Sequence, residues 1–375
     1  MGLYAEDMDR LYHGRTAFIQ LVVAAATMVV ALVGASLLVS YIGSLAPPWF
    51  WDNPWIRGII GAILWAAIAG VGGLYLTWLE RKVMARIQVR YGPNRWGKYG
   101  LLQPFADAIK LLTKEDVILD AADKAVFRAA PIVAFAPAFL AFAAVPVTAE
   151  LIVSRTDIGI LFIIAVSSLT PIGAIMAGWG PNNKWNLIGG MRFAAQMISY
   201  EVPMVLAIIG PIALARSLNG VTIVMAQAGY WFGFIPKWYV FLQPLGFLIF
   251  LIAFMAETCR IPFDLPEAEN ELVGGWITEY SGMKFVMLLL VEYVHLIAGG
   301  ALVVVLFLGG WQGPFLPPLA WFMIKLLAVI FFMMLVRATH FRTRIDQLLA
   351  LGWKVLLPLA LLNIGITGII LALTV

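Results

Sequence analysis

MKFVMLLLVEYVHLIAGGALVVVLFLGG, residues 283–310, is the stretch that decides the fold of this chain. At a rise of about 1.5 Å per residue, a helix of this length exceeds the roughly 30 Å hydrocarbon core of a bilayer. Only Lys284, near its start, and Glu292, inside it, carry a charge at neutral pH. The stretch therefore predicts a membrane-spanning helix that holds a carboxylate at membrane depth.

Apolar runs of similar length recur along the whole chain. The composition agrees with them, because 62% of the residues are hydrophobic and only 12% are charged, whereas soluble domains carry about 25% charge. No soluble domain or repeat interrupts the pattern, so we expect one all-α polytopic membrane protein. The predicted spanning helices are 17–43, 58–79, 129–149, 158–179, 193–215, 239–257, 283–310, 318–337 and 353–374.

The basic residues are distributed very unevenly between the two sides of these helices. The chain has 25 Lys and Arg residues, and Lys325 lies inside the eighth helix. Because cytoplasmic loops collect Lys and Arg, the pattern predicts a cytoplasmic N-terminus and a C-terminus on the opposite side. The basic charge marks a membrane face, which leaves no support for nucleic-acid binding. The side predicted to be non-cytoplasmic holds only Arg57, Arg155, Arg216 and Lys237.

The loop after the second helix carries the pattern of a short amphipathic helix. Asp107, Lys110 and Lys114 fall on its wetter side, which favours a helix lying at the membrane surface over an ordinary solvated loop. The apolar side would consist of Leu101, Leu102, Phe105, Ile109, Leu111 and Leu112.

Several charged side chains fall where lipid is expected. Glu80 closes the second helix, Glu201 lies within the fifth, Glu257 ends the sixth and Glu292 lies inside the seventh. Each costs several kcal/mol unless it is paired, solvated or protonated, so each predicts either a structural ion pair or a functional site. Lys325 is ambiguous, and one interpretation is that it pairs with one of these glutamates.

The densest acidic cluster is AETCRIPFDLPEAENELVGGWITEY, residues 256–280, where Arg260 is the only cation. If Pro266 starts a helical turn, Glu267 and Glu271 share one face, and each raises the pKa of the other. Such a cluster would hold protons near neutral pH. A solvated acidic loop is the alternative, although the many apolar residues of the segment oppose it. The carboxylates are Glu257, Asp264, Glu267, Glu269, Glu271 and Glu279.

Other kinds of site find little support. Cys259 is the only cysteine, so the chain can form neither an internal disulfide nor a four-cysteine cluster. Glu292 and His295 form an E-x-x-H pair, but a di-iron site needs a second copy, which favours a packing or relay role for His295. There is no P-loop, and no dinucleotide motif has the right context. We therefore expect no metal site and no bound cofactor in this chain alone.

Four long segments of the chain carry a common signal. They are ERKVMARIQVRYGPNRWGKYGLLQPFADAIKLLTKED from Glu80, GWGPNNKWNLIGGMRFAAQMISYEVP from Gly178, ETCRIPFDLPEAENELVGGWITEY from Glu257 and RATHFRTRIDQLLALGWKVLLPL from Arg337. All four closely resemble one known family, the H subunits of bacterial NADH–quinone oxidoreductase, or respiratory complex I. The resemblance runs in order from about residue 60 to the C-terminus.

The resemblance implies a role for each region. It implies an eight-helix membrane domain, residues 58–375, in the inner membrane of a bacterium. Quinone is the implied substrate, while FMN and iron–sulfur clusters would reside in partner subunits. The implied partners are the hydrophilic-arm subunits at the quinone site and the small membrane subunits. Residues 1–57 would form an N-terminal extension with the additional helix.

The resemblance also implies two groups of site residues. One group would line the quinone chamber or dock the hydrophilic arm: Glu80, Arg81, Arg90, Arg95, Asp107, Arg260, Asp264 and Arg342. The other would form a proton relay that couples quinone reduction to proton translocation: Glu201, Glu257, Glu267, Glu269, Glu271, Glu279 and Glu292. From the residues alone, the arginines would serve either to stabilise a developing quinol anion or to dock an acidic surface.

The chain departs from the family pattern at three places. The extension 1–57 is unusual, Phe341 stands where a proline is usual, and Cys259 stands where asparagine is common.

Two alternative functions remain. One alternative is the equivalent subunit of a membrane-bound hydrogenase or a ferredoxin-driven complex. The other is a stand-alone proton-coupled transporter, which would predict two related halves with broken helices, and no such symmetry is visible.

Overall fold

The computed structural model describes residues 54–149, 152, 156–231 and 235–374. The predicted helix 17–43 lies outside the described residues. Among the described residues, six helical segments are long and apolar enough to cross a membrane: Lys124–Ala144, Gly159–Trp179, Lys184–Ala215, Gly282–Phe307, Pro318–Thr339 and Ile345–Leu373.

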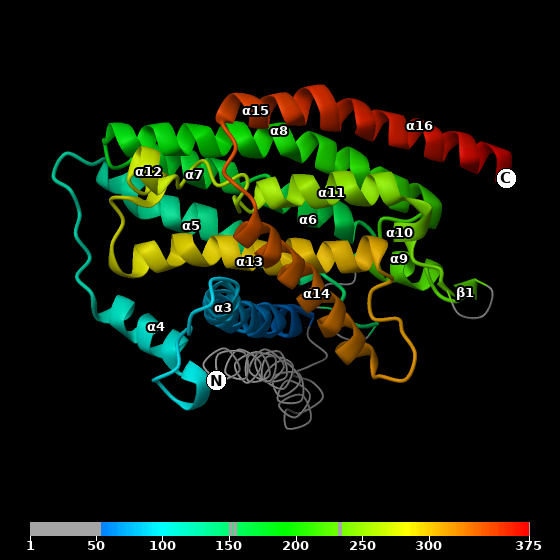
Figure 1. Ribbon diagram of the computed structural model, residues 1–375, viewed down its shortest axis with the longest axis horizontal. Helices are drawn as coiled ribbons and strands as arrows, with labels where there is room; N and C mark the ends of the chain where they lie inside the picture. Colours follow the sequence, from blue (N-terminus) through cyan, green and yellow to red (C-terminus); the bar gives the residue numbers. More distant parts are fainter. Residues whose placement is uncertain (1–53, 150–151, 153–155, 232–234, 375) are drawn as a thin grey trace, which may run out of the picture.

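The helices are labelled in Figure 1. They are α3 (Pro54–Ile87), α4 (Gln103–Thr113), α5 (Lys124–Ala141), α6 (Gly159–Ser167), α7 (Thr170–Trp179), α8 (Lys184–Ala215), α9 (Gly220–Ala226), α10 (Tyr239–Leu242), α11 (Pro244–Glu257), α12 (Glu269–Leu272), α13 (Gly282–Phe307), α14 (Pro318–Thr339), α15 (Ile345–Ala350) and α16 (Leu357–Thr374).

Short elements complete the fold. A π-helical turn, Leu351–Leu356, joins α15 to α16. Three 3₁₀ turns cover Lys98–Gly100, Phe142–Ala144 and Gly275–Ile277. Two-residue strands β1 (Tyr230–Trp231) and β2 (Ile235–Pro236) pair antiparallel, with Tyr230 opposite Pro236 and Trp231 opposite Ile235.

The prediction of an all-α polytopic membrane protein is confirmed for the described residues. Each predicted span from 129–149 onward overlaps a helix, and 58–79 lies within α3. Several boundaries were wrong: α3 continues to Ile87, α8 begins already at Lys184, and the last helical segment begins at Ile345. Hydropathy ends a span at the first charged residues, whereas Glu, Lys and Arg are good helix formers and continue the helix.

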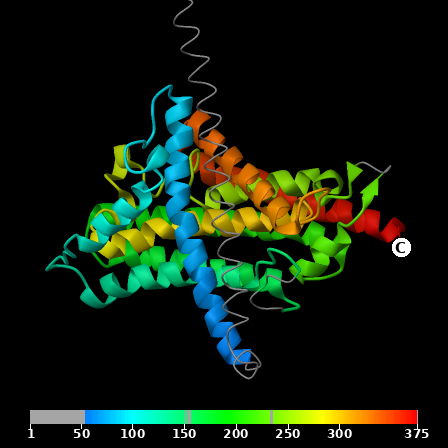
Figure 2. The ribbon, with the colours of Figure 1, turned by 90° about the horizontal axis from the view of Figure 1, so that it is seen from below.

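The central helix of the bundle is α13. Within its apolar window 78% of the residues are buried, against 22% for the segment that contains α16. In Figure 1, α13 runs between α5 above it and α3 below, while α8 and α16 lie on the far side of α5. Figure 2 shows that α3 crosses the other long helices steeply. This crossing brings one part of α3 against both α13 and α14, where the carboxylates gather.

Glycines allow the backbones of neighbouring helices to touch. A Cβ atom added to Gly173 on α7 would lie 2.5 Å from the backbone nitrogen of Ala134 on α5. The hydrophobic driving force between helices is weak in lipid. Small residues at such contacts instead allow close van der Waals packing, which holds the helices together. The α5–α7 contact therefore depends on the absence of a side chain at Gly173.

We expect Gly173→Ala to lower the free energy of unfolding by about 1–3 kcal/mol, because the new methyl group has no space and the helices must separate. The measurement is the thermal unfolding of the purified chain in detergent. Gly365→Ala is the matched control, since a Cβ atom at Gly365 has no neighbour within 4 Å. Equal transition temperatures for the two variants would contradict the close contact.

Candidate functional site

The loop that joins α11 to α13 positions most of the acidic side chains, and two neighbouring elements hold it. On α8, the Nε2 atom of the buried Gln196 donates hydrogen bonds to the carbonyl oxygens of Ala256 (2.7 Å) and Phe263 (2.8 Å). After α14, the backbone N–H of Thr343 donates to the carbonyl oxygen of Pro262 at 3.0 Å. The loop is therefore fixed in the bundle and does not float in solvent.

A buried ion cluster forms around Glu80 of α3. The Nη1 atom of Arg260 lies 2.8 Å from both carboxylate oxygens of Glu80, and the two side chains are only 5% and 7% exposed. Tyr293 on α13 donates its hydroxyl to Glu80 at 2.8 Å, and Arg337 on α14 forms a further hydrogen-bonded ion pair with it. One carboxylate thus connects three helices and the loop.

The second carboxylate near Arg260 is Glu292 on α13. The Nη2 atom of Arg260 lies 3.8 Å from an Oε atom of Glu292, too far for a hydrogen bond. Glu267 from the loop lies against Glu292 and shares a hydrogen bond with it. Burial and the neighbouring negative charge of Glu292 raise the pKa of Glu267 well above its ordinary value. Glu267 therefore holds a proton more tightly than an ordinary glutamate does, and Glu292 lies next to it.

A further carboxylate pair lies on the other side of Cys259. Glu201 on α8 hydrogen-bonds to the Ser168 hydroxyl at the break between α6 and α7. Glu257, at the end of α11, interacts with Glu201 and with the Ser167 hydroxyl. The buried Cys259 thiol interacts electrostatically with Glu257 and also with Glu267 and Glu292. Cys259 therefore lies near carboxylates of both pairs, and we call the carboxylates from Glu80 to Glu201 the acidic run.

The remaining predicted residues surround this run. Asp264 accepts a hydrogen bond from Arg342 at 2.7 Å, and burial raises the pKa of Asp264 although Arg342 opposes the shift. Two further ion pairs, Arg81–Asp107 and Arg192–Glu271, lie at the surface. Arg90 and Arg95 are exposed, with Arg90 donating to Gln88, and Glu269 is exposed at the start of α12. The other contacts are Arg81–Asp107 (2.7 Å), Arg192–Glu271 (2.6 Å) and Asn183–Glu279 (2.6 Å).

The predicted amphipathic helix is present as α4. Its Asp107 side chain faces Arg81 of α3, and the Phe105 ring makes an edge contact with Tyr75 of α3. Ile109 and Leu112 are 62% and 61% exposed. The helix therefore carries an apolar face that the described part of this chain does not cover.

Two predicted pairings were wrong. Glu267 and Glu271 do not share a helical face, because α12 begins only at Glu269 and leaves Glu267 in an irregular turn that points it inward. Lys325 does not pair with a glutamate. Its ammonium group donates to three backbone carbonyls, those of Leu308, Gly310 and Gln312.

The position of His295 agrees with a packing role, one of the two roles expected from the sequence. It is buried on α13, and its Nε2 atom lies 3.1 Å from the Thr170 hydroxyl on α7. In the part of the chain that the structure describes, no group of three or more His, Cys, Asp or Glu side chains could hold a metal ion. The E-x-x-H pair of Glu292 and His295 thus lacks further ligands there.

Sequence reasoning missed four residues that complete the site. Tyr293 and Arg337 bind Glu80, and Ser167 and Ser168 bind the glutamates of the second pair. Tyr293 stands next to Glu292, and Arg337 begins one of the four family segments, so both carried a signal. The two serines carried none, because small hydroxyl residues are common in membrane helices.

Comparison with known proteins identifies the family of this chain. The family described as NADH dehydrogenase matches residues 59–368. The chain belongs to this family. The H subunit of NADH-quinone oxidoreductase from Dehalococcoides mccartyi strain CBDB1 is 51% identical over 84% of this chain and 87% of its own length. The H subunit from Bacillus thuringiensis strain Al Hakam is 48% identical over 87% of this chain and 97% of its own length.

A third relative within the family is the H 2 subunit of NADH-quinone oxidoreductase from Syntrophobacter fumaroxidans, which is 51% identical over 78% of this chain and 89% of its own length. The matched region of the family begins in α3 and ends in α16. It therefore includes every carboxylate of the acidic run.

We expect Glu80→Gln to destabilise the protein by about 3–5 kcal/mol, because it leaves Arg260 and Arg337 without their shared counter-charge in a buried position. Thermal unfolding of the purified chain measures the loss. Asp346→Asn is the control, since Asp346 and Arg344 form an exposed pair, 64% and 74% accessible, that is worth at most about 1 kcal/mol. Equal losses would contradict the buried cluster.

Glu267 should make stability depend on pH. Its pKa is raised in the folded state, so the folded protein holds this proton more tightly than the unfolded chain, whose glutamate titrates near 4.3. Stability should therefore fall as the pH rises from there through the raised pKa. Glu267→Gln cannot ionise and should flatten this dependence in unfolding scans at several pH values. The exposed Glu269→Gln is the control, and parallel curves for Glu267→Gln and wild type would refute the raised pKa of Glu267.

Proposed function

We propose that this chain is a membrane subunit of a bacterial NADH–quinone oxidoreductase that helps to form the quinone chamber and couples quinone reduction to proton translocation. The observation that carries the proposal is the acidic run from Glu80 to Glu201. Within it, an ionised cluster, the Glu267–Glu292 pair and a second carboxylate pair follow one another inside a helical bundle. The relatives are named as H subunits of NADH-quinone oxidoreductase, and these names supply the reaction.

The chamber part of the proposal rests on the surface near α4. The apolar face of α4 and the exposed Arg81, Arg90 and Arg95 lie at the same end of α3. An apolar surface suits a quinone tail, and the guanidinium groups suit either the anionic quinol oxygen or an acidic partner surface. Partner subunits would complete the chamber and supply electrons from an iron–sulfur cluster, with FMN further upstream. This chain contributes side chains and no redox centre to that reaction.

The coupling part of the proposal rests on electrostatics in a low-dielectric environment. Reduction of quinone to quinol takes up two electrons and two protons, which changes the charge next to the acidic run. Carboxylates that lie close together in such surroundings titrate as coupled groups, so a proton gained or lost at one changes the occupancy of the next. Glu267 and Glu292 would pass this change past Cys259 to Glu257 and Glu201.

The same proposal fixes the orientation of the chain. With the acidic run on the cytoplasmic half of a bacterial inner membrane, the loops rich in Lys and Arg face the cytoplasm, as the positive-inside rule demands. The hydrophilic arm would dock there. Glu271 and Glu279, paired with Arg192 and Asn183 at the start of α8, would face that arm.

We expect Glu201→Gln and Glu292→Gln each to reduce proton-coupled quinone reduction at least severalfold in the assembled complex, because each removes a carboxylate from the acidic run. Electron transfer from NADH to an artificial acceptor at the flavin should stay unchanged. The measurements are quinone reductase activity and proton uptake in membrane vesicles.

Glu115→Gln is the matched control, since Glu115 is exposed on a loop and the charge change is the same. Wild-type proton pumping in both test variants would exclude the relay role. Co-purification with a hydrogenase large subunit, in place of the NADH- and flavin-binding subunits, would refute the proposed reaction.

A further inference from the structure

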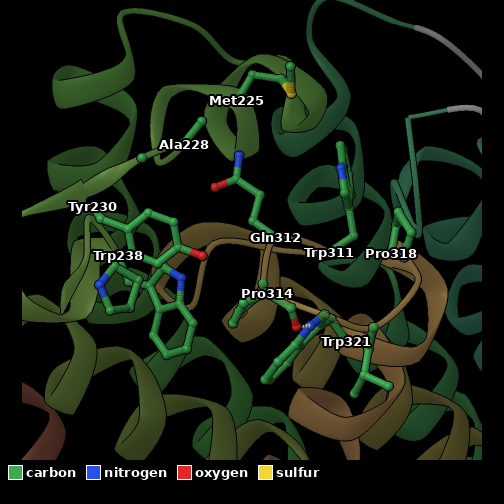
Figure 3. A pocket seen from close by; sticks show the side chains of 13 residues that line it. Met225, Ala228, Tyr230, Trp238, Trp311, Gln312, Pro314, Pro318 and Trp321 are labelled. Carbon is green, nitrogen blue, oxygen red and sulfur yellow. Dashed lines mark hydrogen bonds between the residues drawn. The ribbon is translucent and has the colours of Figure 1, made fainter. Parts of the chain in front are cut away.

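A pocket of about 470 Å³ opens where α13 ends and α14 begins, at the opposite end of these helices from the acidic run (Figure 3). Trp238, Trp311 and Trp321 line it together with Tyr230, and the Gln312 side chain lies among them. Pockets of this volume with mostly apolar walls and few polar groups are typical ligand sites. Nothing in the proposed reaction uses this end of the molecule.

Lys325 of α14 holds the loop after α13, and this loop lines the pocket. Its buried ammonium group donates to the carbonyl oxygens of Leu308 (2.7 Å), Gly310 (2.9 Å) and Gln312 (2.7 Å), which uses all three of its protons. The same group lies 4.4 Å from the ring centroid of Trp238. Lys325 therefore fixes both the loop after α13 and one wall of the pocket, and it has no donor left for a ligand.

The loop after α13 is shaped to receive indole rings. A Cβ atom at Gly309, whose φ is 71°, would lie 2.5 Å from the Trp238 ring, and one at Gly313 would lie 2.4 Å from the Trp321 ring. The Trp321 Nε1–H donates to the carbonyl oxygen of Pro314 at 2.7 Å. Because the two rings lie directly on the loop backbone, the pocket is a preformed cavity with rigid walls.

A cation stands at the rim of the pocket. Lys237 is exposed, lies between the lining residues Pro236 and Trp238, and its backbone N–H donates to the carbonyl oxygen of Gly229, another lining residue. The side-chain stem of Lys237 passes within 4 Å of the Cβ position of Gly229. Lys237 is one of only four Lys and Arg residues assigned to this side of the chain. Few other cations are therefore present on this side to bind an anionic group beside the cavity.

We propose that this pocket binds an anionic phospholipid, with one acyl chain between Trp238, Trp311 and Trp321 and the headgroup phosphate on Lys237. Tryptophan and lysine are the residues that anchor proteins at the boundary between acyl chains and headgroups. An apolar cavity with a cation at its mouth matches the two ends of such a lipid. A free anion would use only Lys237, and an apolar side chain from a neighbouring protein of the complex would use only the cavity.

The test is titration of the delipidated full-length chain in detergent with phosphatidylglycerol that carries brominated acyl chains, which quench tryptophan fluorescence on contact. Wild type should show a saturable quenching component at low lipid concentration. Ala228→Phe fills the pocket from its lining and should abolish that component. Ala372→Phe, an equally exposed alanine on α16, is the control and should retain it.

The headgroup contact has its own variant. Lys237→Gln leaves the rings in place and should weaken apparent binding about fivefold, as the loss of one interfacial lysine implies. Lys98→Gln, an exposed lysine in the loop before α4, should bind as wild type does. Phosphatidylcholine with the same chains should bind wild type more weakly than phosphatidylglycerol does, because its choline cation offsets the phosphate charge, and Lys237→Gln should weaken its binding less.

Three results would overturn the proposal: equal quenching of wild type and Ala228→Phe, Lys237→Gln binding equal to wild type, or a side chain from a neighbouring protein found in the pocket of the assembled complex.

Discussion

The rest of the structure depends on the guanidinium group of Arg260. It lies at the start of the loop after α11, is nearly inaccessible to solvent, and connects α3 through Glu80 to α13 through Tyr293 and Glu292. A charge in that position is tolerated only with counter-charges beside it. The steep crossing of α3, the break of the chain after α11 and the inward position of Glu267 together bring carboxylates to this one group.

Arg260 contacts its two neighbouring carboxylates, Glu80 and Glu292, in different ways. Its Nη1 atom binds both oxygens of Glu80, whereas its Nε and Nη2 atoms are buried without a hydrogen-bond partner. At the 3.8 Å that separates Nη2 from Glu292, the attraction between unit charges is still on the order of 4 kcal/mol near a protein surface. Glu80 is therefore held by hydrogen bonds from three side chains. Glu292 instead faces an arginine nitrogen that has no hydrogen-bond partner among the described residues, and it has Glu267 beside it.

The sequence was sufficient for the helical spans and for the residue types of the site, because apolar length and a carboxylate at membrane depth are both visible along the chain. The sequence could not show which charged side chains pair with one another. Glu80 and Arg260 are 180 positions apart, and which cation meets which anion depends on how α3 crosses the bundle. The turn at Pro266 was also misjudged, since helix propensity placed Glu267 on a helix that tertiary packing starts only at Glu269. Lys325 looked like a charge partner because sequence does not show that the carbonyls after α13 turn toward it.

The two ends of α13 differ in a way that bears on coupling. At its C-terminal end, the three carbonyls around Lys325 leave no unsatisfied donor on that ammonium group, so the loop there has little freedom to respond. At its N-terminal half, Glu292 faces Glu267 and an arginine with unused donors. In the proposed relay, a change of charge at the acidic run would therefore be answered by rearrangement among Glu292, Glu267 and Arg260, and the loop after α13 would not move. The change would then pass to the neighbouring carboxylates Glu257 and Glu201 and would not be lost in movement of the helix.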